Sequence, residues 1–150
     1  MNETKEETLA GELQAHFPFL AGQVRIQRPR RIWVETPDDK FMEIFACLAE
    51  KMDFRILCTI TGLDAGDSFG FIYHMAREDG IVLNLRTKIA KVPGQWKSIG
   101  KFFPGGVIYE REIVDLLGVK FEDLPPGSRY PLPDNWPEGQ YPLRKDWQGL

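Results

Sequence analysis

The residues best suited to bind a metal ion or to act as nucleophiles are two cysteines and two histidines: Cys47, Cys58, His16 and His74. A zinc site or an iron–sulfur cluster uses about four ligands that lie close together. These four residues are scattered along the chain and form no CxxC pair. We therefore interpret both cysteines as small buried apolar residues. His74 is expected to be a structural histidine on a strand, and His16 a solvated residue at a helix end.

Two further segments have residue types that occur in ligand-binding loops. Asp64 and Asp67 flank Gly66, but the full ligand spacing of a calcium loop is missing, so this segment is interpreted as a hairpin turn. The glycine-rich segments at 62–66 and 104–106 match neither GxGxxG nor GxxxxGKS/T. The sequence therefore does not predict a nucleotide-binding loop.

The segment YEREIVD at residues 109–115 has the densest charge pattern. On a helix, Arg111 and Asp115 are four residues apart and can form an ion pair. Glu110 and Glu112 point to different sides, so they do not form a paired-carboxylate acid/base site. Periodicity alone predicts a solvated helix with surface ion pairs, each of which contributes little to stability.

A second charged segment lies near the C-terminus, where Arg144, Lys145 and Asp146 precede Trp147. Basic residues beside aromatic ones are typical of nucleic-acid binding. Here the basic patch is two residues long and an acid follows it. The net charge of the chain is −3, so no general basic field attracts nucleic acid or anionic lipid. We expect no nucleic-acid partner.

Hydrophobic periodicity predicts an α+β domain with two layers, in which helices cover a mainly antiparallel sheet. Thr36 followed by Pro37 is typical of an N-cap and a first helical position. Alternating apolar residues and short turns predict antiparallel strands. The expected helices are 4–16, 37–51 and 107–117, and the expected strands lie around 24–26, 32–34, 54–61, 69–76 and 81–89.

The composition changes after residue 124. Six of the eleven prolines lie in residues 125–150, where they exclude a helix or a central strand. Four large aromatic residues are interleaved with them, too much apolar area for a disordered tail. We therefore divide the chain into an α+β domain at 1–124 and an extended proline-rich C-terminal arm at 125–150. Such an arm is suited to lie along its own domain or a partner. The aromatic residues are Tyr130, Trp136, Tyr141 and Trp147.

The length of 150 residues fits one domain with a real core. No stretch approaches the roughly 18 apolar residues of a transmembrane helix. The N-terminal segment is acidic and polar, unlike a secretory signal. From these features we expect a cytoplasmic location.

Two segments together resemble one known family, the thirty-kilodalton subunit of respiratory complex I, which is the C subunit of bacterial NADH-quinone oxidoreductase. Residues 109–112 read YERE, 115–119 read DLLGV and position 121 is phenylalanine, which is similar to the family signature. Residues 132–138 read LPDNWPE and 141–147 read YPLRKDW, similar to the family's arm, which ends in PLRKD and an aromatic residue. After the signature phenylalanine the family usually carries a His-Pro-x-Leu-Arg segment. Here residues 122–130 read EDLPPGSRY, in which Arg129 matches the arginine and the histidine is absent.

The resemblance implies a non-catalytic, cofactor-free structural subunit in the hydrophilic arm of a membrane-bound, proton-pumping NADH:quinone oxidoreductase. Its partners would be the catalytic subunit of the forty-nine-kilodalton type and a neighbouring iron–sulfur subunit, on the cytoplasmic face of the membrane. The isolated chain could form a homodimer through its unoccupied arm. The alternatives are the equivalent subunit of an energy-converting nickel–iron hydrogenase or formate hydrogenlyase, a stand-alone peptide-binding module, and a small enzyme.

The resemblance also assigns residues of both segments to the interface with the partner, with the aromatic side chains as anchors. The charged clusters would make fixed polar contacts that single substitutions disturb. The expected interface residues are Glu110, Arg111, Glu112, Asp115, Gly118, Arg129, Trp136, Tyr141, Arg144, Lys145, Asp146 and Trp147.

Overall fold

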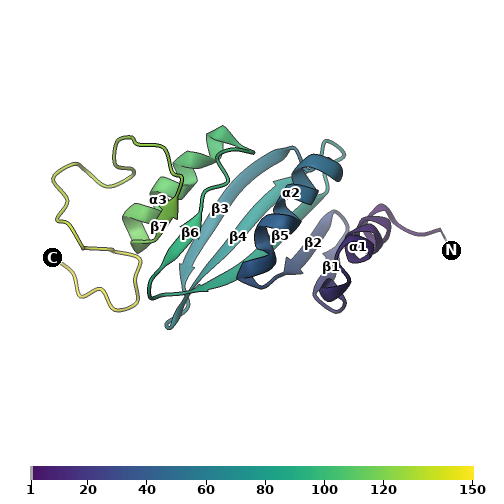
Figure 1. Cartoon of the computed structure of the whole chain (residues 1–150), viewed down its shortest axis with the longest axis horizontal. Coiled ribbons are helices and arrows are strands. Elements are labelled where there is room, and N and C mark those ends of the chain that lie inside the picture. The colour runs from purple at the N-terminus through teal and green to yellow at the C-terminus, as the bar shows by residue number, and fades with distance from the viewer. Residues whose placement is uncertain (1) are drawn as a thin grey trace. The chain divides into compact units, whose positions relative to one another are not determined.

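The computed structural model describes residues 2–150 (Figure 1), and the chain divides into two compact units. Unit 1 comprises the chain up to Thr59 together with Ile72–Thr87, and unit 2 comprises Ile60–Phe71 and Lys88–Leu150. The five-stranded sheet has the order β1-β2-β5-β4-β3. Its strands are β1 (Val24–Arg28), β2 (Arg31–Glu35), β3 (Ile56–Asp64), β4 (Ser68–Ala76) and β5 (Val82–Ala90).

The sheet confirms the predicted α+β class and contains one pair that the sequence did not predict. β1 and β2 form the expected antiparallel hairpin, in which Arg25 lies opposite Trp33. The connections at 65–67 and 77–81 are too short for a parallel crossover, so β3, β4 and β5 run antiparallel in turn. β2 and β5, however, are parallel neighbours, with Val34 opposite Leu85. The sheet is therefore mixed: the pair β2–β5, whose strands are distant in sequence, is parallel, and the other pairs are antiparallel.

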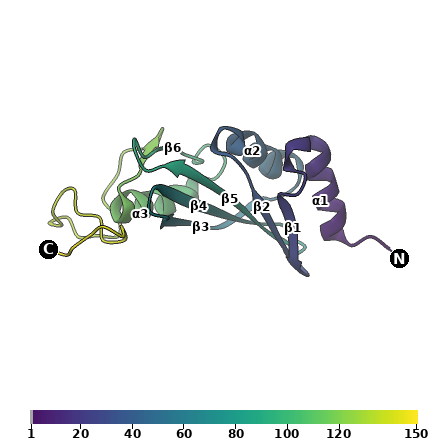
Figure 2. The ribbon, with the colours of Figure 1, turned by 90° about the horizontal axis from the view of Figure 1, so that it is seen from below.

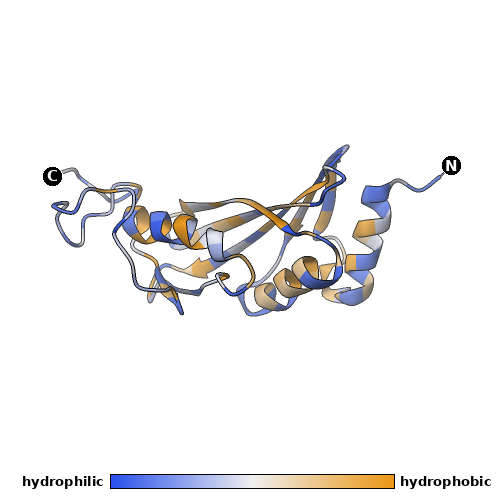
Figure 3. Ribbon diagram, turned by 90° about the horizontal axis from the view of Figure 1, so that it is seen from above, coloured by the Kyte–Doolittle hydropathy of each residue, from blue (hydrophilic) through white to orange (hydrophobic). Residues whose placement is uncertain are grey.

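Two α-helices lie in the described part of unit 1. α1 (Lys5–His16) begins at a capping box in which Thr4 and Glu7 satisfy each other's backbone amides. α2 (Phe41–Lys51) lies on one side of β2 and β5 (Figure 2), and Figure 3 shows its predominance of hydrophobic residues. The rings of Phe41 and Phe45 lie 4.7 and 5.5 Å from the ring of Tyr73 on β4. These buried aromatic contacts form the core of unit 1.

The start of the second helix was predicted wrongly. The Thr36 hydroxyl donates to the Pro37 carbonyl and caps no helix, and the amide of Thr36 donates to the Arg86 carbonyl of β5. Thr36 therefore still pairs with the sheet, and Pro37 is extended with ψ 155°. A short 3-10 turn, Asp38–Lys40, then leads into α2 at Phe41.

The cysteines and histidines lie where sequence reasoning placed them, with one exception. Cys47 is buried in α2, but Cys58 is exposed on the edge strand β3, so its predicted burial is wrong. His74 has the expected structural contact, since its Nδ1 lies 2.6 Å from the Asn84 side-chain oxygen. His16 is exposed at the end of α1.

Unit 2 contains α3 (Val107–Leu117) and a small parallel sheet of β6 (Gln95–Lys97) and β7 (Lys120–Glu122). The predicted helix at 107–117 is confirmed, and Gly118 ends it with φ 73° as its C-cap. The β6–β7 pair was not predicted. Its Trp96 and Phe121 rings pack on Phe71 at 5.7 and 6.2 Å.

Residues 125–150, called the arm below, contain no helix or strand. They run in turns and bends beside α3 (Figure 1), and Figure 3 shows that most of them are hydrophilic. No helix among residues 2–150 is both long and apolar enough to cross a membrane.

Candidate functional site

The signature helix α3 holds the first half of the arm through Asp115, whose side chain is buried. Arg129 donates from Nε to Asp115 Oδ1 at 2.8 Å, and the amide of Leu132 donates to Oδ2 at 2.9 Å. Arg129 also donates to the Trp136 carbonyl at 2.8 Å. Arg129 is the only arginine of the segment 122–130, in which the sequence departs from the family pattern. It joins Asp115 of α3 to the arm at residues 129 and 136.

Arg111 has a different partner from the one expected. It donates to the carbonyl oxygens of Pro125 and Pro126 at 2.9 and 3.1 Å. Gly127 lies directly against its guanidinium and leaves no room for a Cβ atom. The predicted pair between Arg111 and Asp115 is replaced by two separate contacts with the arm, because the arm supplies both partners.

Arg144 attaches the end of the arm to α3 and to β4. Its Nε donates to the Leu117 carbonyl at 2.6 Å, which is one of the carbonyls left without a partner at the end of α3. Its guanidinium lies over the Tyr141 ring at 4.6 Å and the Phe69 ring at 5.4 Å. Gly118 lies below them, since an added Cβ would sit 2.5 Å from a ring carbon of Tyr141.

Asp64, which was predicted to be a turn residue, is buried and forms an ion pair with Lys91. Its carboxylate accepts from Lys91 Nζ at 2.7 Å, from the amide of Lys145 at 2.9 Å and from the amide of Gly66 at 2.8 Å. Burial raises the pKa of Asp64, but the hydrogen bond from Lys91, those from the two amides and the charge of Lys91 outweigh it and lower the pKa to about 2. Asp64 therefore ties the arm at residue 145 to the end of β3.

Glu110 is also buried, contrary to the predicted solvated helix. Its side chain accepts from the Ser98 hydroxyl and from the Ile99 amide, both at 2.7 Å. Burial raises the pKa of Glu110, against the lowering effect of these two hydrogen bonds. It therefore holds the loop after β6 against α3.

The two tryptophans of the arm contact each other. Their rings lie 6.3 Å apart, and both indole nitrogens donate to Gln140: Trp136 to its carbonyl at 2.8 Å and Trp147 to its side chain at 3.0 Å. Both rings remain partly exposed. They close this part of the arm into a loop and keep part of their own surface exposed.

The remaining predicted interface residues point to solvent. Glu112, Lys145 and Asp146 are exposed. Leu143, two residues before Lys145, keeps 56% of its surface exposed. The structure thus divides the predicted residues into two groups: those that fix the arm to the rest of unit 2 and those whose side chains are exposed. Within residues 2–150, no group of three or more His, Cys, Asp or Glu side chains is arranged to hold a metal ion.

Comparison with known proteins places the chain in a family. The family model described as "Respiratory-chain NADH dehydrogenase, 30 Kd subunit" matches residues 34–149. The chain belongs to this family. The resemblance in the two C-terminal segments is thereby confirmed, and it extends through most of both units.

Curated relatives in this respiratory-chain family cover nearly the whole chain. The C subunit of F(420)H(2) dehydrogenase from Methanosarcina mazei is 30% identical over 95% of this chain and 92% of its own length. The membrane-bound hydrogenase subunit beta of Pyrococcus furiosus is 28% identical over 98% of this chain and 88% of its own. The C/D subunit of NADH-quinone oxidoreductase from Edwardsiella ictaluri is 29% identical over 95% of this chain but only 25% of its own length.

Solved structures share the fold of this family member. A chain of the membrane-bound sulfane sulfur reductase, an archaeal respiratory membrane complex, superposes with a TM-score of 0.83 at 24% identity, covering 98% of this chain and 88% of that one. A trypsin-resistant fragment of Nqo5 superposes with a TM-score of 0.68 at 22% identity, covering 83% of this chain and all of the fragment.

The close approach of the arm to the end of α3 predicts a large effect at Gly118. Gly118→Ala places a Cβ at positive φ, which costs about 1 kcal/mol, and pushes it into Tyr141 and Arg144. We expect a loss of about 2–3 kcal/mol in the free energy of unfolding, measured by chemical denaturation.

Gly139→Ala is the matched control for this substitution. Gly139 has nearly the same φ, 74°, but nothing lies within 4 Å of its added Cβ. It should lose only the backbone cost of about 1 kcal/mol. Equal losses in the two variants would show that Tyr141 and Arg144 do not pack closely on Gly118.

Proposed function

We propose that this chain is a non-catalytic, cofactor-free subunit of a membrane-bound oxidoreductase complex of the NADH:quinone type. In this proposal it lies on the cytoplasmic face of the membrane and packs against the catalytic subunit of the forty-nine-kilodalton type, beside an iron–sulfur subunit. The arm, residues 125–150, is the docking element. Its role is to order the neighbouring subunit and so maintain the spacing of that subunit's redox sites.

The observation that carries this proposal is the way the arm is held. Asp64, Asp115 and Leu117 each bind the arm by direct hydrogen bonds, although it has no secondary structure. An irregular segment fixed in advance loses less entropy on binding than a flexible one. Its open side chains, including Leu143 and Lys145, are then presented in a defined arrangement.

The choice of partner is supported by the fused relative. The C/D subunit of Edwardsiella ictaluri is similar to this chain over only a quarter of its length. The rest of that polypeptide is a different region, fused to a region of this type. By its name, that remainder is of the D type. A D-type subunit is therefore the partner that we propose for the arm.

A second candidate is the equivalent subunit of a complex with another electron donor. The specific observation in its favour is the 30% identity to the C subunit of F(420)H(2) dehydrogenase, together with the similarity to the hydrogenase subunit beta. The absence of the His-Pro segment after Phe121 is a further departure from the complex I pattern. The donor site would lie on other subunits in either case.

The proposal is tested by gentle affinity purification of the tagged chain from native membranes, with identification of the co-purifying chains and an absorbance scan. A large catalytic subunit with broad iron–sulfur absorbance is the expected result, and the accompanying chains distinguish an NADH-type complex from a hydrogenase-type one. Recovery of the chain alone and colourless from cells that express the complex would overturn the proposal.

A substitution on the open side of the arm should separate docking from folding. We expect Leu143→Asp to reduce the recovered catalytic subunit by about tenfold, because a charge is buried at the interface, with the thermal unfolding midpoint unchanged. Val92→Asp is the control, since Val92 is an aliphatic residue of unit 2 outside the arm and is 85% exposed. Equal recovery with the two variants would show that the arm does not dock through Leu143.

A further inference from the structure

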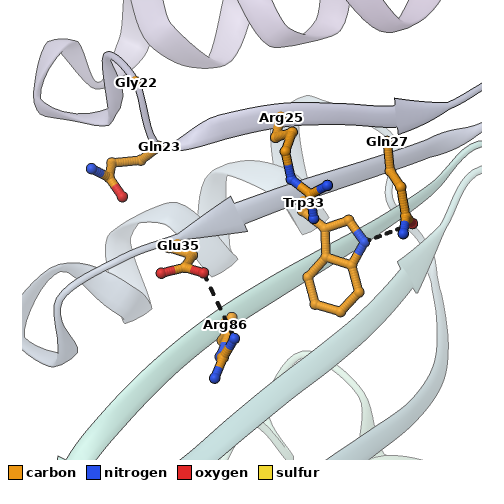
Figure 4. A pocket seen from close by; sticks show the side chains of 7 residues that line it. All are labelled: Gly22, Gln23, Arg25, Gln27, Trp33, Glu35 and Arg86. Carbon is orange, nitrogen blue, oxygen red and sulfur yellow. Dashed lines mark hydrogen bonds and ion pairs between the residues drawn. The ribbon is translucent and has the colours of Figure 1, made fainter.

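An open pocket of about 400 Å³ lies on the β1–β2 hairpin and the adjoining strand β5 of unit 1 (Figure 4). The alternation along β2 explains its position: Ile32 and Val34 are buried in the core, so Trp33 and Glu35 point to the opposite face. The main lining side chains are Gln23, Arg25, Gln27, Trp33, Glu35 and Arg86.

Two arginine side chains and an aromatic ring line the pocket. Arg25 lies directly opposite Trp33 in the hairpin, and Figure 4 shows its guanidinium beside the indole. The indole nitrogen donates to Gln27 at 3.0 Å, which fixes the ring. Arg86 lies opposite Glu35 in the parallel pairing of β5 with β2, two residues along β2 from Trp33.

The charges of this face are incompletely neutralised. The Arg86 Nη1 atom and the Glu35 carboxylate are 3.7 Å apart, and the two side chains are 36% and 60% exposed, so their pairing contributes little. The Nε of Arg86 is buried and has no hydrogen-bond partner among the described residues. Residues 25–31 contain four arginines and no acid, although the chain as a whole carries a net charge of −3.

The backbone of the hairpin offers a further means of binding. β1 is an edge strand of the sheet, and four of its five residues are exposed. An exposed edge strand can pair with an added extended segment through its outward backbone groups. Side chains of that segment would alternate, so every second one would face the pocket.

We propose that this face binds an extended acidic segment of a partner polypeptide. Carboxylates of the segment pair with Arg25 and Arg86, an apolar side chain between them packs on Trp33, and the backbone pairs with β1. Glu35 within the pocket disfavours the continuous polyanion of a nucleic acid, whereas an extended peptide can place an uncharged side chain beside it. The proposal goes beyond the docking arm, because it uses residues of unit 1 only.

The test uses the full chain and a defined probe, an eight-residue peptide with blocked ends in which glutamate alternates with valine. Two-dimensional NMR follows the backbone amides and the indole resonances. The indole resonance of Trp33 and the amides of β1 and β2 should shift, whereas the indole resonances of the arm should not. About 0.5 M salt should abolish the shifts, because the contacts are between exposed charges.

Charge reversal provides the decisive comparison. Arg25→Glu combined with Arg86→Glu should weaken peptide binding about tenfold or more, whereas Lys51→Glu, an exposed site at the end of α2, should leave it unchanged. The proposal is overturned by shifts that spread over both units, by tighter binding of a single-stranded oligonucleotide than of the peptide, or by a concentration-dependent shift without peptide, which would indicate a second copy of this chain.

Discussion

Replacing Asp64 with alanine should lower the free energy of unfolding by about 3 kcal/mol. The carboxylate is 1% exposed, and the Lys91 side chain that donates to it is 16% exposed. Without the carboxylate, the Lys91 ammonium and the Lys145 amide both lose this acceptor in a place that water reaches poorly. The loss should also release the arm at residue 145, because this hydrogen bond is what ties it to the end of β3.

Equilibrium denaturation of Asp64→Ala and Asp67→Ala measures this effect. Asp67 lies in the same turn, but its side chain is exposed, so Asp67→Ala should change stability by less than about 0.5 kcal/mol. Limited proteolysis reports separately on the arm, which should be cleaved faster in Asp64→Ala. Similar stabilities for the two variants would mean that the ion pair with Lys91 contributes nothing beyond a surface contact.

The same carboxylate makes stability depend on pH. Because folding lowers the pKa of Asp64 from 3.8 to about 2, the unfolded chain binds a proton more readily than the folded one. The stabilisation is therefore complete above the unfolded pKa and is lost as the pH falls from about 4 toward 2. Asp64→Asn cannot titrate, so its stability should vary less over this interval than that of the parent chain.

Asp64 shows why local sequence reasoning missed part of the site. A turn such as DAGDS predicts solvent exposure, and nothing in the neighbouring sequence indicates otherwise. The partners that bury Asp64 are Lys91 and Lys145, which lie 27 and 81 residues away. The same is true of Asp115, whose partner Arg129 comes from the irregular arm. Periodicity carries no information on such contacts, because it describes one element at a time.

The elements themselves were largely predictable. Buried faces of helices and strands repeat at fixed intervals, so α2, α3 and the strands β3 to β5 were found within about four residues of their observed bounds. The parallel pairing of β2 with β5 was not found, since it depends on which strands meet after the chain has passed through α2, β3 and β4. Thr36 was misread for the same reason, because its amide pairs with β5.

The family could be recognised although periodicity predicts no contact between distant segments, because the family pattern combines motifs from two such segments. YERE in α3 occupies 109–112 and PLRKD in the arm occupies 142–146, yet Arg144 of the second binds the last turn of the helix that carries the first. Gly118 is required at the point where the two meet. The spacing of the two motifs therefore reflects a contact within the fold, in addition to any contact with a partner.

Substitution of Glu110 by alanine should lower the free energy of unfolding as much as substitution of Asp64, whereas substitution by glutamine should have little effect. Glu110→Ala leaves the buried Ile99 amide and the Ser98 hydroxyl without this acceptor and opens a cavity, so we expect a loss of about 3 kcal/mol. Glu110→Gln keeps an acceptor for the Ile99 amide and removes the buried charge. Its stability at pH 7 should lie within about 1 kcal/mol of the parent chain.

The pH dependence at Glu110 has the opposite sign to that at Asp64. Burial raises the folded pKa of Glu110 above its ordinary value of 4.5, so the folded chain holds this proton more tightly than the unfolded chain. Its contribution is therefore complete below pH 4.5 and is lost as the pH rises through the folded pKa. Denaturation of Glu110→Gln between pH 4 and pH 8 should show a smaller decline than the parent chain. A decline of the same size would mean that another group titrates there, and that the carboxylate of Glu110 is ionised at little cost because Ser98 and Ile99 stabilise its charge.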